Sequence, residues 1–345
     1  MKIIFRFLFL LLPVLSSCKQ QLVPADISDF ENYQVLEKSD VIGDTIFLGR
    51  PSTIRVMNNW LVLSDRYDKK LLSWVSPDWR TSKHNVNQGD GPFEFLPPIR
   101  FYSEDGGSIV KIVEVQTGEV FKYDWKDVSA EKFNEPVQVD KLPIYAGQVI
   151  PCGAYYVAND MKQDYNMFSL LSVDGNVLTR FGKYPGELPV ASKDNPMSMT
   201  LITQCSMAYN ESGQVMAAAG YMSDMLSFYK IDDGNVSLIK EYFTFNPQVD
   251  LKEGNHGVSM RRNGNTLDTY IDICSTESGF YALYWGSNER NRVALSYVQA
   301  FNLKGEFIKG YQIKEHIGSI AVDEERKLLY GINIKGEPSI SIFEL

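Results

Sequence analysis

The stretch that decides the fold reads Thr53-Ile-Arg-Val-Met57, Asn58-Asn59, Trp60-Leu-Val-Leu63, Ser64-Asp-Arg-Tyr-Asp-Lys-Lys70, Leu71-Leu-Ser-Trp-Val75. Its apolar runs are short and rich in aliphatic, β-branched and aromatic side chains, and polar residues that favour turns separate them. Runs of this length and composition predict antiparallel strands rather than helices. The stretch is therefore interpreted as one compact β unit that begins at Thr53.

The same order of strands and turns recurs along the rest of the chain. The innermost strands of the later units are predicted at Arg100–Tyr102, Gln148–Pro151, Ser206–Tyr209, Tyr270–Cys274 and Ser319–Val322. Units of roughly 55 residues match a propeller blade with its insertions. The sequence thus predicts an all-β, six-bladed β-propeller, and a decorated β-sandwich is the structural alternative.

The two ends of this repeat pattern are incomplete in a complementary way. The sixth unit stops after three strands at Leu345, whereas the apolar segment Asp44–Gly49 precedes the first unit without a partner. An unpaired edge strand would promote aggregation. We therefore predict that residues 44–49 complete the last blade and close the ring, with the propeller spanning residues 44–345.

The N-terminus has the features of a bacterial secretion signal. Lys2 and Arg6 precede the apolar run Phe7–Val14, which is too short to span a bilayer as a helix. The sequence Leu15-Ser16-Ser17-Cys18 that follows resembles a lipobox, although an ordinary signal whose cleavage site contains a cysteine is the alternative. We expect residues 1–17 to be a signal peptide, Cys18 to be lipidated, and residues 18–43 to form a tether.

A loop motif after the first unit carries a resemblance to a known family. Residues 87–95 read Asn-Gln-Gly-Asp-Gly-Pro-Phe-Glu-Phe, and a weaker echo, Phe-Gly-Lys-Tyr-Pro-Gly-Glu, occupies residues 181–187. The first motif is similar to the Gly-x-Gly-Pro-Gly-Glu-Phe motif of TolB-like and NHL-like propeller lipoproteins of Bacteroidetes, from which it departs at Phe93. The resemblance implies a six-bladed propeller in the cell envelope. Lys19-Gln20-Gln21 lacks the acidic residues that accompany surface export in such lipoproteins. A periplasm-facing anchor in the outer membrane is therefore expected, with exposure at the cell surface as the alternative.

Composition excludes two broad classes. The 43 acidic residues outnumber the 34 Lys and Arg, which gives a formal net charge of −9. A general nucleic-acid binder needs a basic surface, so nucleic acid is not expected as a partner. With 44% hydrophobic residues, the chain is too apolar to be disordered. We expect a folded monomer that is attached to the membrane only through the lipid on Cys18.

The cysteines give little indication of chemistry. Cys152, Cys205 and Cys274 fall near the ends of predicted inner strands, where small buried hydrophobic residues are expected. One disulfide plus one free thiol is the alternative in an oxidising compartment.

Catalytic and metal-binding residues do not converge in the sequence either. His84, His256 and His316 are scattered, no Gly-x-Ser-x-Gly elbow occurs, and the inner strands offer only Asp272 and Glu104 as carboxylates. No metal ion, cofactor or catalytic residue is therefore predicted.

Polar residues gather instead in loops that should share one rim of the ring. Because strands alternate in direction within a blade, the loops between second and third strands lie on the same face as the crossings between blades. The long crossing Pro247–Asn265 belongs to that face and carries the positive charges of Arg261 and Arg262. Turn preferences alone could also place polar residues there. The candidate ligand-binding residues are Asp65, Arg66, Asp160, Tyr221, His256, Arg261, Arg262, Trp285 and Arg290.

These features favour a non-catalytic binding or interaction module in the envelope that recognises a glycan, a peptide or another envelope protein. Arginines offer forked donors, and Tyr221 and Trp285 offer flat apolar surfaces. The alternative is a metal-assisted propeller hydrolase or lyase that acts on a carbohydrate or lactone. A fold of this type hosts both classes of protein, so the fold alone does not decide between them.

Overall fold

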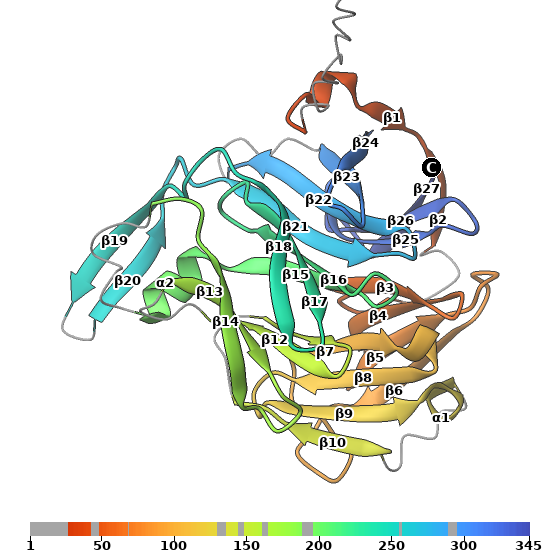
Figure 1. The fold of residues 1–345 in the computed structure, drawn as a ribbon. Helices are drawn as coiled ribbons and strands as arrows, with labels where there is room; N and C mark the ends of the chain where they lie inside the picture. The colour runs from red at the N-terminus through yellow and green to blue at the C-terminus, as the bar shows by residue number, and fades with distance from the viewer. Residues whose placement is uncertain are drawn as a thin grey trace, which may run out of the picture.

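In a computed structural model, the chain forms a six-bladed β-propeller (Figure 1). The structure describes residues 27–42, 48–67, 69–129, 136–143, 148–160, 165–187, 196–254, 257–288 and 295–345. Within these ranges, each blade is built on four antiparallel strands whose first strand lies next to the central channel. The prediction of an all-β, six-bladed propeller is confirmed.

The strands follow the predicted units closely. From the channel outward, the first three blades contain β3 (Thr53–Met57), β4 (Trp60–Tyr67), β5 (Lys70–Val75) and β6 (Ser82–Asn87); β7 (Ile99–Glu104), β8 (Ile109–Glu114), β9 (Glu119–Asp124) and β10 (Gln138–Lys141); β11 (Val149–Cys152), β12 (Tyr155–Asn159), β13 (Asn166–Leu171) and β14 (Val177–Lys183). The core strands of blades four and five are β15 (Cys205–Asn210), β16 (Val215–Gly220), β17 (Leu226–Asp232) and β18 (Asn235–Tyr242); β21 (Asp268–Ser275), β22 (Gly279–Ser287), β23 (Ser296–Asn302) and β24 (Phe307–Ile313). The sixth blade contains β25 (Ile317–Asp323), β26 (Leu328–Asn333), β27 (Ser339–Glu344) and β2 (Lys38–Ile42).

An N-terminal strand closes the ring, but it is not the strand that the sequence predicted. β2 pairs antiparallel with β27, so the closing residues are Lys38–Ile42 rather than 44–49. Residues 44–47 of the predicted strand lie outside the described part of the chain. Immediately before β2, β1 (Gln34–Leu36) adds in parallel to β24 at the outer edge of blade five. We call residues 27–42 the N-terminal strap, because this segment joins the outer edges of the last two blades.

The strap begins with an aromatic cluster on blade five. A short 3-10 helix, η1 (Phe30–Asn32), places the Phe30 ring 4.5 Å from the Tyr297 ring and 5.2 Å from the Tyr284 ring, measured between centroids. The Tyr33 hydroxyl donates a hydrogen bond to the carbonyl of Ile27 at 2.6 Å. These contacts fix the chain before β1 and β2 begin.

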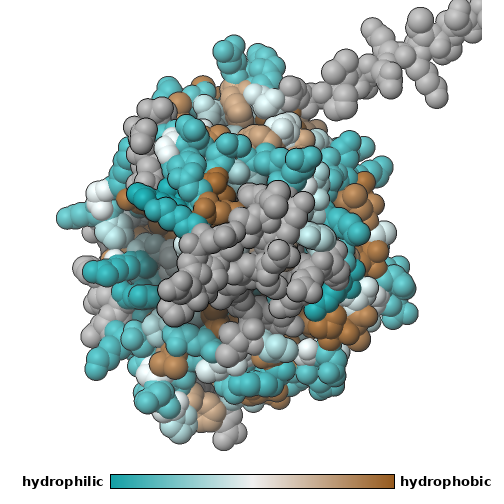
Figure 2. All heavy atoms as spheres, turned by 90° about the vertical axis from the view of Figure 1, so that its left-hand side faces the viewer, coloured by the Kyte–Doolittle hydropathy of each residue, from teal (hydrophilic) through white to brown (hydrophobic). Residues whose placement is uncertain are grey.

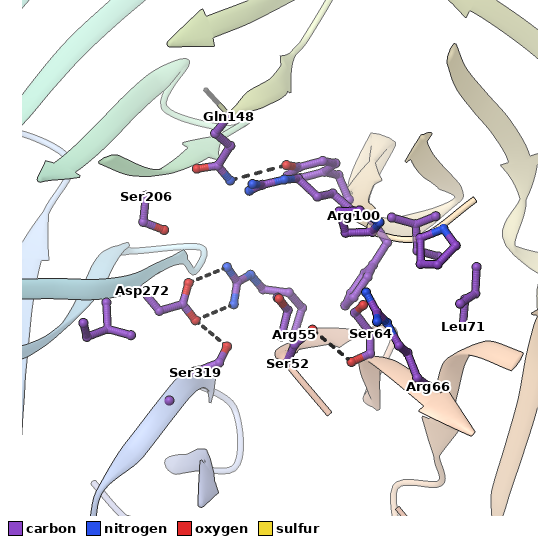
Figure 3. Close-up of a pocket in the computed structure, with 18 of the residues that line it drawn as sticks. Ser52, Arg55, Ser64, Arg66, Leu71, Arg100, Gln148, Ser206, Asp272 and Ser319 are labelled. Carbon is purple, nitrogen blue, oxygen red and sulfur yellow. Dashed lines mark hydrogen bonds and ion pairs between the residues drawn. The ribbon is translucent and has the colours of Figure 1, made fainter. Parts of the chain in front are cut away.

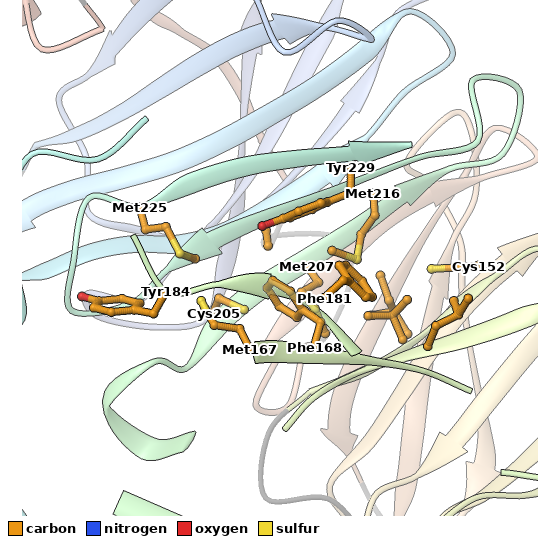
Figure 4. Close-up of a cluster of buried hydrophobic side chains, with 14 of the residues drawn as sticks. Cys152, Met167, Phe168, Phe181, Tyr184, Cys205, Met207, Met216, Met225 and Tyr229 are labelled. Carbon is orange, nitrogen blue, oxygen red and sulfur yellow. The ribbon is translucent and has the colours of Figure 1, made fainter. Parts of the chain in front are cut away.

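Apolar cores between neighbouring blades hold the inner strands around the channel. The core between blades three and four is rich in sulfur (Figure 4). Methionine is flexible and polarisable, so it can fill the irregular space between two twisted sheets. The sulfur-bearing and aromatic residues of this core include Cys152, Met167, Phe168, Phe181, Tyr184, Cys205, Met207, Met216, Met225 and Tyr229.

The glycine-rich motif forms the crossing from blade one to blade two. Phe95 is fully buried, and its amide donates to the Asn87 carbonyl at 2.9 Å. The Glu94 carboxylate accepts a hydrogen bond from the Gly91 amide at 3.1 Å. Phe93 has a φ of +61°, a left-handed conformation that glycine adopts with less strain. The one departure from the family motif therefore falls where the backbone favours the family's glycine.

The long crossing after blade four is a β-hairpin rather than an irregular loop. β19 (Val249–Gly254) pairs with β20 (Gly257–Arg262), and the hairpin packs beside the short helix α2 (Pro196–Ile202) at the left of Figure 1. Val249, Leu251 and Met260 contact the core between blades three and four. The described surface on this side is mostly hydrophilic, with scattered hydrophobic residues (Figure 2).

The remaining helical segments are short. They are α1 (Trp125–Ser129), which follows β9, and a 3-10 turn, η2 (Asp105–Gly107), which joins β7 to β8. Among the described residues, no helix has the length and apolar character needed to cross a bilayer.

Candidate functional site

The inner strands surround a cavity of about 270 Å³ at the end of the channel where these strands begin. We call this end the channel mouth. Its lining comes from the first residues of inner strands and from the ends of the second strands β4 and β16 (Figure 3). The lining includes Ser52, Arg55, Ser64, Arg66, Arg100, Tyr102, Gln148, Ser206, Tyr221, Asp272 and Ser319.

The floor of the mouth is an ion pair between the inner strands of blades one and five, which flank blade six. Arg55 of β3 binds Asp272 of β21 in a bidentate manner, with Nη1–Oδ2 and Nη2–Oδ1 distances of 2.9 and 2.8 Å. The Asp272 carboxylate also accepts hydrogen bonds from the Ser319 hydroxyl and from the amides of Ile320 and Ile273. The pair therefore ties the inner strands of blades one, five and six together.

The electrostatics of this pair favour the charged form of Arg55. Burial lowers the pKa of Arg55, but the charge and hydrogen bonds of Asp272 outweigh burial and raise that pKa above its ordinary value. Asp272 is only 6% exposed, and its accepted hydrogen bonds satisfy the carboxylate. The pair is consequently a fixed structural element rather than a reactive group.

Two further arginines reach the cavity without such a partner. Arg66 is the second-to-last residue of β4 and is exposed, and Arg100 lies in β7 and is half-buried. Their side chains extend into the mouth in Figure 3, and neither forms a hydrogen bond or an ion pair with a described residue. Two guanidinium groups are therefore available to a ligand at this mouth.

Neutral polar groups complete the lining. Burial raises the pKa of Tyr221 to about 12, and the charge of Arg100 acts in the opposite direction. Both residues line the same cavity. Gln148 donates to the Tyr102 hydroxyl at 3.5 Å and accepts from the Met207 amide at 2.8 Å. The mouth thus combines positive charge with hydroxyl and amide groups.

Of the predicted site residues, the cavity brings together Arg66 and Tyr221. Asp65 is 1% exposed and accepts hydrogen bonds from the amides of Gly49 and Arg50 and from the Ser73 hydroxyl, so it holds a loop. Asp160 is also buried, and its amide donates to the Met167 carbonyl. These two aspartates stabilise the rim but do not line the mouth.

Trp285, Arg261 and Arg262 are described but do not line the cavity. The indole of Trp285 donates to the Ile317 carbonyl at 2.7 Å and stacks on the His316 ring at 4.1 Å. Arg262 forms an ion pair with Asp268 at 2.6 Å, whereas Arg261 is exposed on β20. The predicted residues Cys18, His256 and Arg290 lie outside the described residues.

The opposite end of the channel has a second cavity, of about 350 Å³. Its charged lining residues other than Arg55 are Glu104, Glu211 and Glu277. Glu104 forms an ion pair with Lys111, which is 1% exposed, at 2.5 Å. The channel therefore has a basic mouth at one end and an acidic mouth at the other.

The cysteines and histidines do not assemble into a reactive centre in the described residues. Cys152, Cys205 and Cys274 are buried free thiols, and burial raises the pKa of each. The expectation of small buried hydrophobic residues is thus confirmed for all three. Burial lowers the pKa of His84, whose ring forms a hydrogen bond with the Ser73 hydroxyl at 2.7 Å. Within the described ranges, no group of three His, Cys, Asp or Glu residues is arranged to hold a metal ion.

Sequence reasoning missed the residues that lie on the inner strands. Arg55 interrupts the apolar run of β3, and this contrast is the signal that could have identified it. Arg100 lies in a strand that also carries Ser103 and Glu104, so no such contrast marks it. Asp272 was noticed as an inner-strand carboxylate, but its partner Arg55 lies 217 residues away in the chain. Such a pairing follows only from closing the ring.

The fold and site define a six-bladed propeller with a basic, polar channel mouth. The chain belongs to the TolB-like 6-blade propeller-like family, whose family model matches residues 29–325. Its fold is similar to that of a DUF4221 family member from Bacteroides vulgatus, with a TM-score of 0.55 and 10% identity over 91% of this chain and 98% of that one. It is also similar to a protein from Bacteroides fragilis that is provisionally described as exported, with a TM-score of 0.54 and 13% identity over 93% and 97% of the two chains. No curated protein matches the sequence.

Proposed function

We propose that this protein is a lipid-anchored, non-catalytic binding module of the bacterial envelope that recognises its ligand at the channel mouth. The observation that carries the proposal is the cavity into which Arg66 and Arg100 extend without a partner among the described residues. Ligands of propellers commonly bind where loops surround the channel. The one carboxylate of the described lining, Asp272, is already held by Arg55, which favours binding over proton transfer.

The envelope location rests on the N-terminal sequence and on one structural relative. Residues 1–18 have the order of a secretion signal that ends in a lipobox-like cysteine. The similar protein of Bacteroides fragilis is provisionally described as exported. The acidic body of the protein would not adhere to anionic lipid by itself, so a lipid on Cys18 would supply the attachment to the outer membrane, facing the periplasm.

We predict that Cys18→Ser abolishes incorporation of labelled fatty acid and releases the protein from the membrane fraction. Serine lacks the thiol to which the lipid would be attached. Metabolic labelling and membrane fractionation of the variant and the natural protein measure both effects. Ser17→Ala is the matched control, because it retains a small residue before the cysteine and should remain lipidated. Lipid labelling of the Cys18→Ser variant would refute the anchor.

A second prediction tests the channel mouth with the same substitution at both ends of the channel. Ser52 is exposed and lines the mouth, whereas Ser212 is exposed and lines the opposite cavity. Ser52→Trp should reduce binding to an array of acidic and neutral oligosaccharides and peptides at least tenfold, because the indole would fill the cavity. Ser212→Trp should leave that binding unchanged. Equal binding by the natural protein and both variants would place the site elsewhere.

A further inference from the structure

We infer that the ligand bound at the channel mouth is an anionic sugar, namely a pyranose ring that carries a carboxylate or a phosphate group. This inference rests on the proposed function and narrows it to one class of ligand. It derives from the charge, the hydrogen-bonding groups and the size of the cavity.

The charge of the mouth is opposite to that of the protein. The charged residues of the described lining are Arg55, Arg66, Arg100 and Asp272, so three positive charges and one negative charge give a formal charge of +2. The whole chain, in contrast, carries a formal charge of −9. A local reversal of sign in a concave, partly desolvated site attracts an anion specifically.

The arrangement of the arginines indicates where the anionic group would bind. Asp272 already occupies the Arg55 guanidinium, which leaves Arg66 and Arg100 with unused donors. The guanidinium group is a planar fork that binds a carboxylate or a phosphate through two parallel hydrogen bonds. Arg66 comes from blade one and Arg100 from blade two, and both line the same cavity, so an anionic group bound there would meet a guanidinium from each of two blades.

The neutral polar part of the lining suits a ligand rich in hydroxyl groups. Ser52, Ser64, Ser206 and Gln148 offer donors and acceptors around the cavity, and Tyr221 adds an aromatic ring. A peptide side chain would gain more from an apolar pocket, whereas sugar hydroxyls require this density of polar partners. The volume of about 270 Å³ is below the roughly 300–1,000 Å³ of pockets for larger ligands, so one ring is expected to enter.

Calorimetric titration of the full-length protein in detergent with four probes tests the inference: glucuronate, glucose 6-phosphate, glucose and a hexaglutamate peptide. At least one of the two charged sugars should bind at least tenfold more tightly than glucose. The charged sugar with the higher affinity identifies the anionic group as a carboxylate or a phosphate. Arg66→Gln and Arg100→Gln should each weaken binding of that sugar at least tenfold, because each removes a charged fork. Arg80→Gln is the matched control, since Arg80 is exposed in the loop between β5 and β6 and does not line the mouth.

Several outcomes would overturn the inference. Equal affinities for glucose and the charged sugars, or failure of both charged sugars to bind, would contradict it. Tighter binding of a hexaglutamate peptide than of either charged sugar would assign the site to acidic peptides instead. If Ser52→Trp blocks binding of a neutral ligand while Arg66→Gln and Arg100→Gln bind that ligand as the natural protein does, the inference fails but the proposed function stands. If a charged sugar still binds to Ser52→Trp, the proposed site itself is wrong.

Discussion

Deletion of the N-terminal strap, residues 27–42, should lower the melting temperature by more than about 10 °C and cause the protein to aggregate. The deletion removes β2 from blade six and β1 from blade five, so β27 becomes an unpaired edge strand. It also removes the buried side chains of Tyr33, Leu36 and Ile42, each of which stabilises the fold by about 1.5–3 kcal/mol. Thermal unfolding and size-exclusion chromatography measure the two effects.

Two neighbouring residues of β1 provide a matched pair of point variants for the same prediction. Leu36 is 4% exposed, whereas Val35 is 42% exposed. Leu36→Ala should lower the free energy of unfolding by about 2–3 kcal/mol, and Val35→Ala by less than about 0.5 kcal/mol. A deletion variant that stays monomeric and melts at an unchanged temperature would show that the strap does not close the ring.

The contrast between β2 and the strand predicted for its place shows what local sequence can establish. β3 coincides with the predicted Thr53–Met57, because its apolar residues and the Asn58-Asn59 turn are local signals. β2 begins with Lys38-Ser39-Asp40, all exposed, so it has little of the hydrophobic pattern of an inner strand. Edge strands are commonly polar in this way. The sequence therefore favoured the more apolar segment 44–49 as the strand that closes the ring.

The hairpin of β19 and β20 was missed for a related reason. Its inward residues Val249, Leu251 and Met260 alternate with exposed polar residues. This alternation with a period of two is a strand signal, but it is weak when half of the residues are charged or polar. The length of the crossing was correctly seen as unusual, whereas its strand structure was not.

The site was predictable only to the extent that loop geometry decides it. Alternation of strand direction was enough to place Arg66 and Tyr221 on one rim, and both line the mouth. It could not show that Asp65 is held by the amides of Gly49 and Arg50, because those contacts depend on how the chain enters blade one. The same alternation could not predict the ion pair between Arg55 and Asp272, since blades one and five approach each other only in the closed ring.

That ion pair provides the second large expected effect. Arg55→Ala should lower the free energy of unfolding by about 3–5 kcal/mol, because it leaves the Asp272 carboxylate buried without its countercharge. Arg55→Lys should restore part of this loss, since lysine keeps the charge but not the two parallel hydrogen bonds. Chemical denaturation with urea measures both changes.

The exposed ion pair between Lys314 and Glu37 is the matched control. Its side chains are 62% and 80% exposed, so Glu37→Ala should change the free energy of unfolding by less than about 1 kcal/mol. Combining Arg55→Ala with Asp272→Ala should cost less than the sum of the two single changes, because the double variant leaves no unpaired charge of this pair. Additive losses, or a loss below about 1 kcal/mol for Arg55→Ala alone, would mean that water entering the mouth solvates Asp272 and that the pair does not hold the blades together.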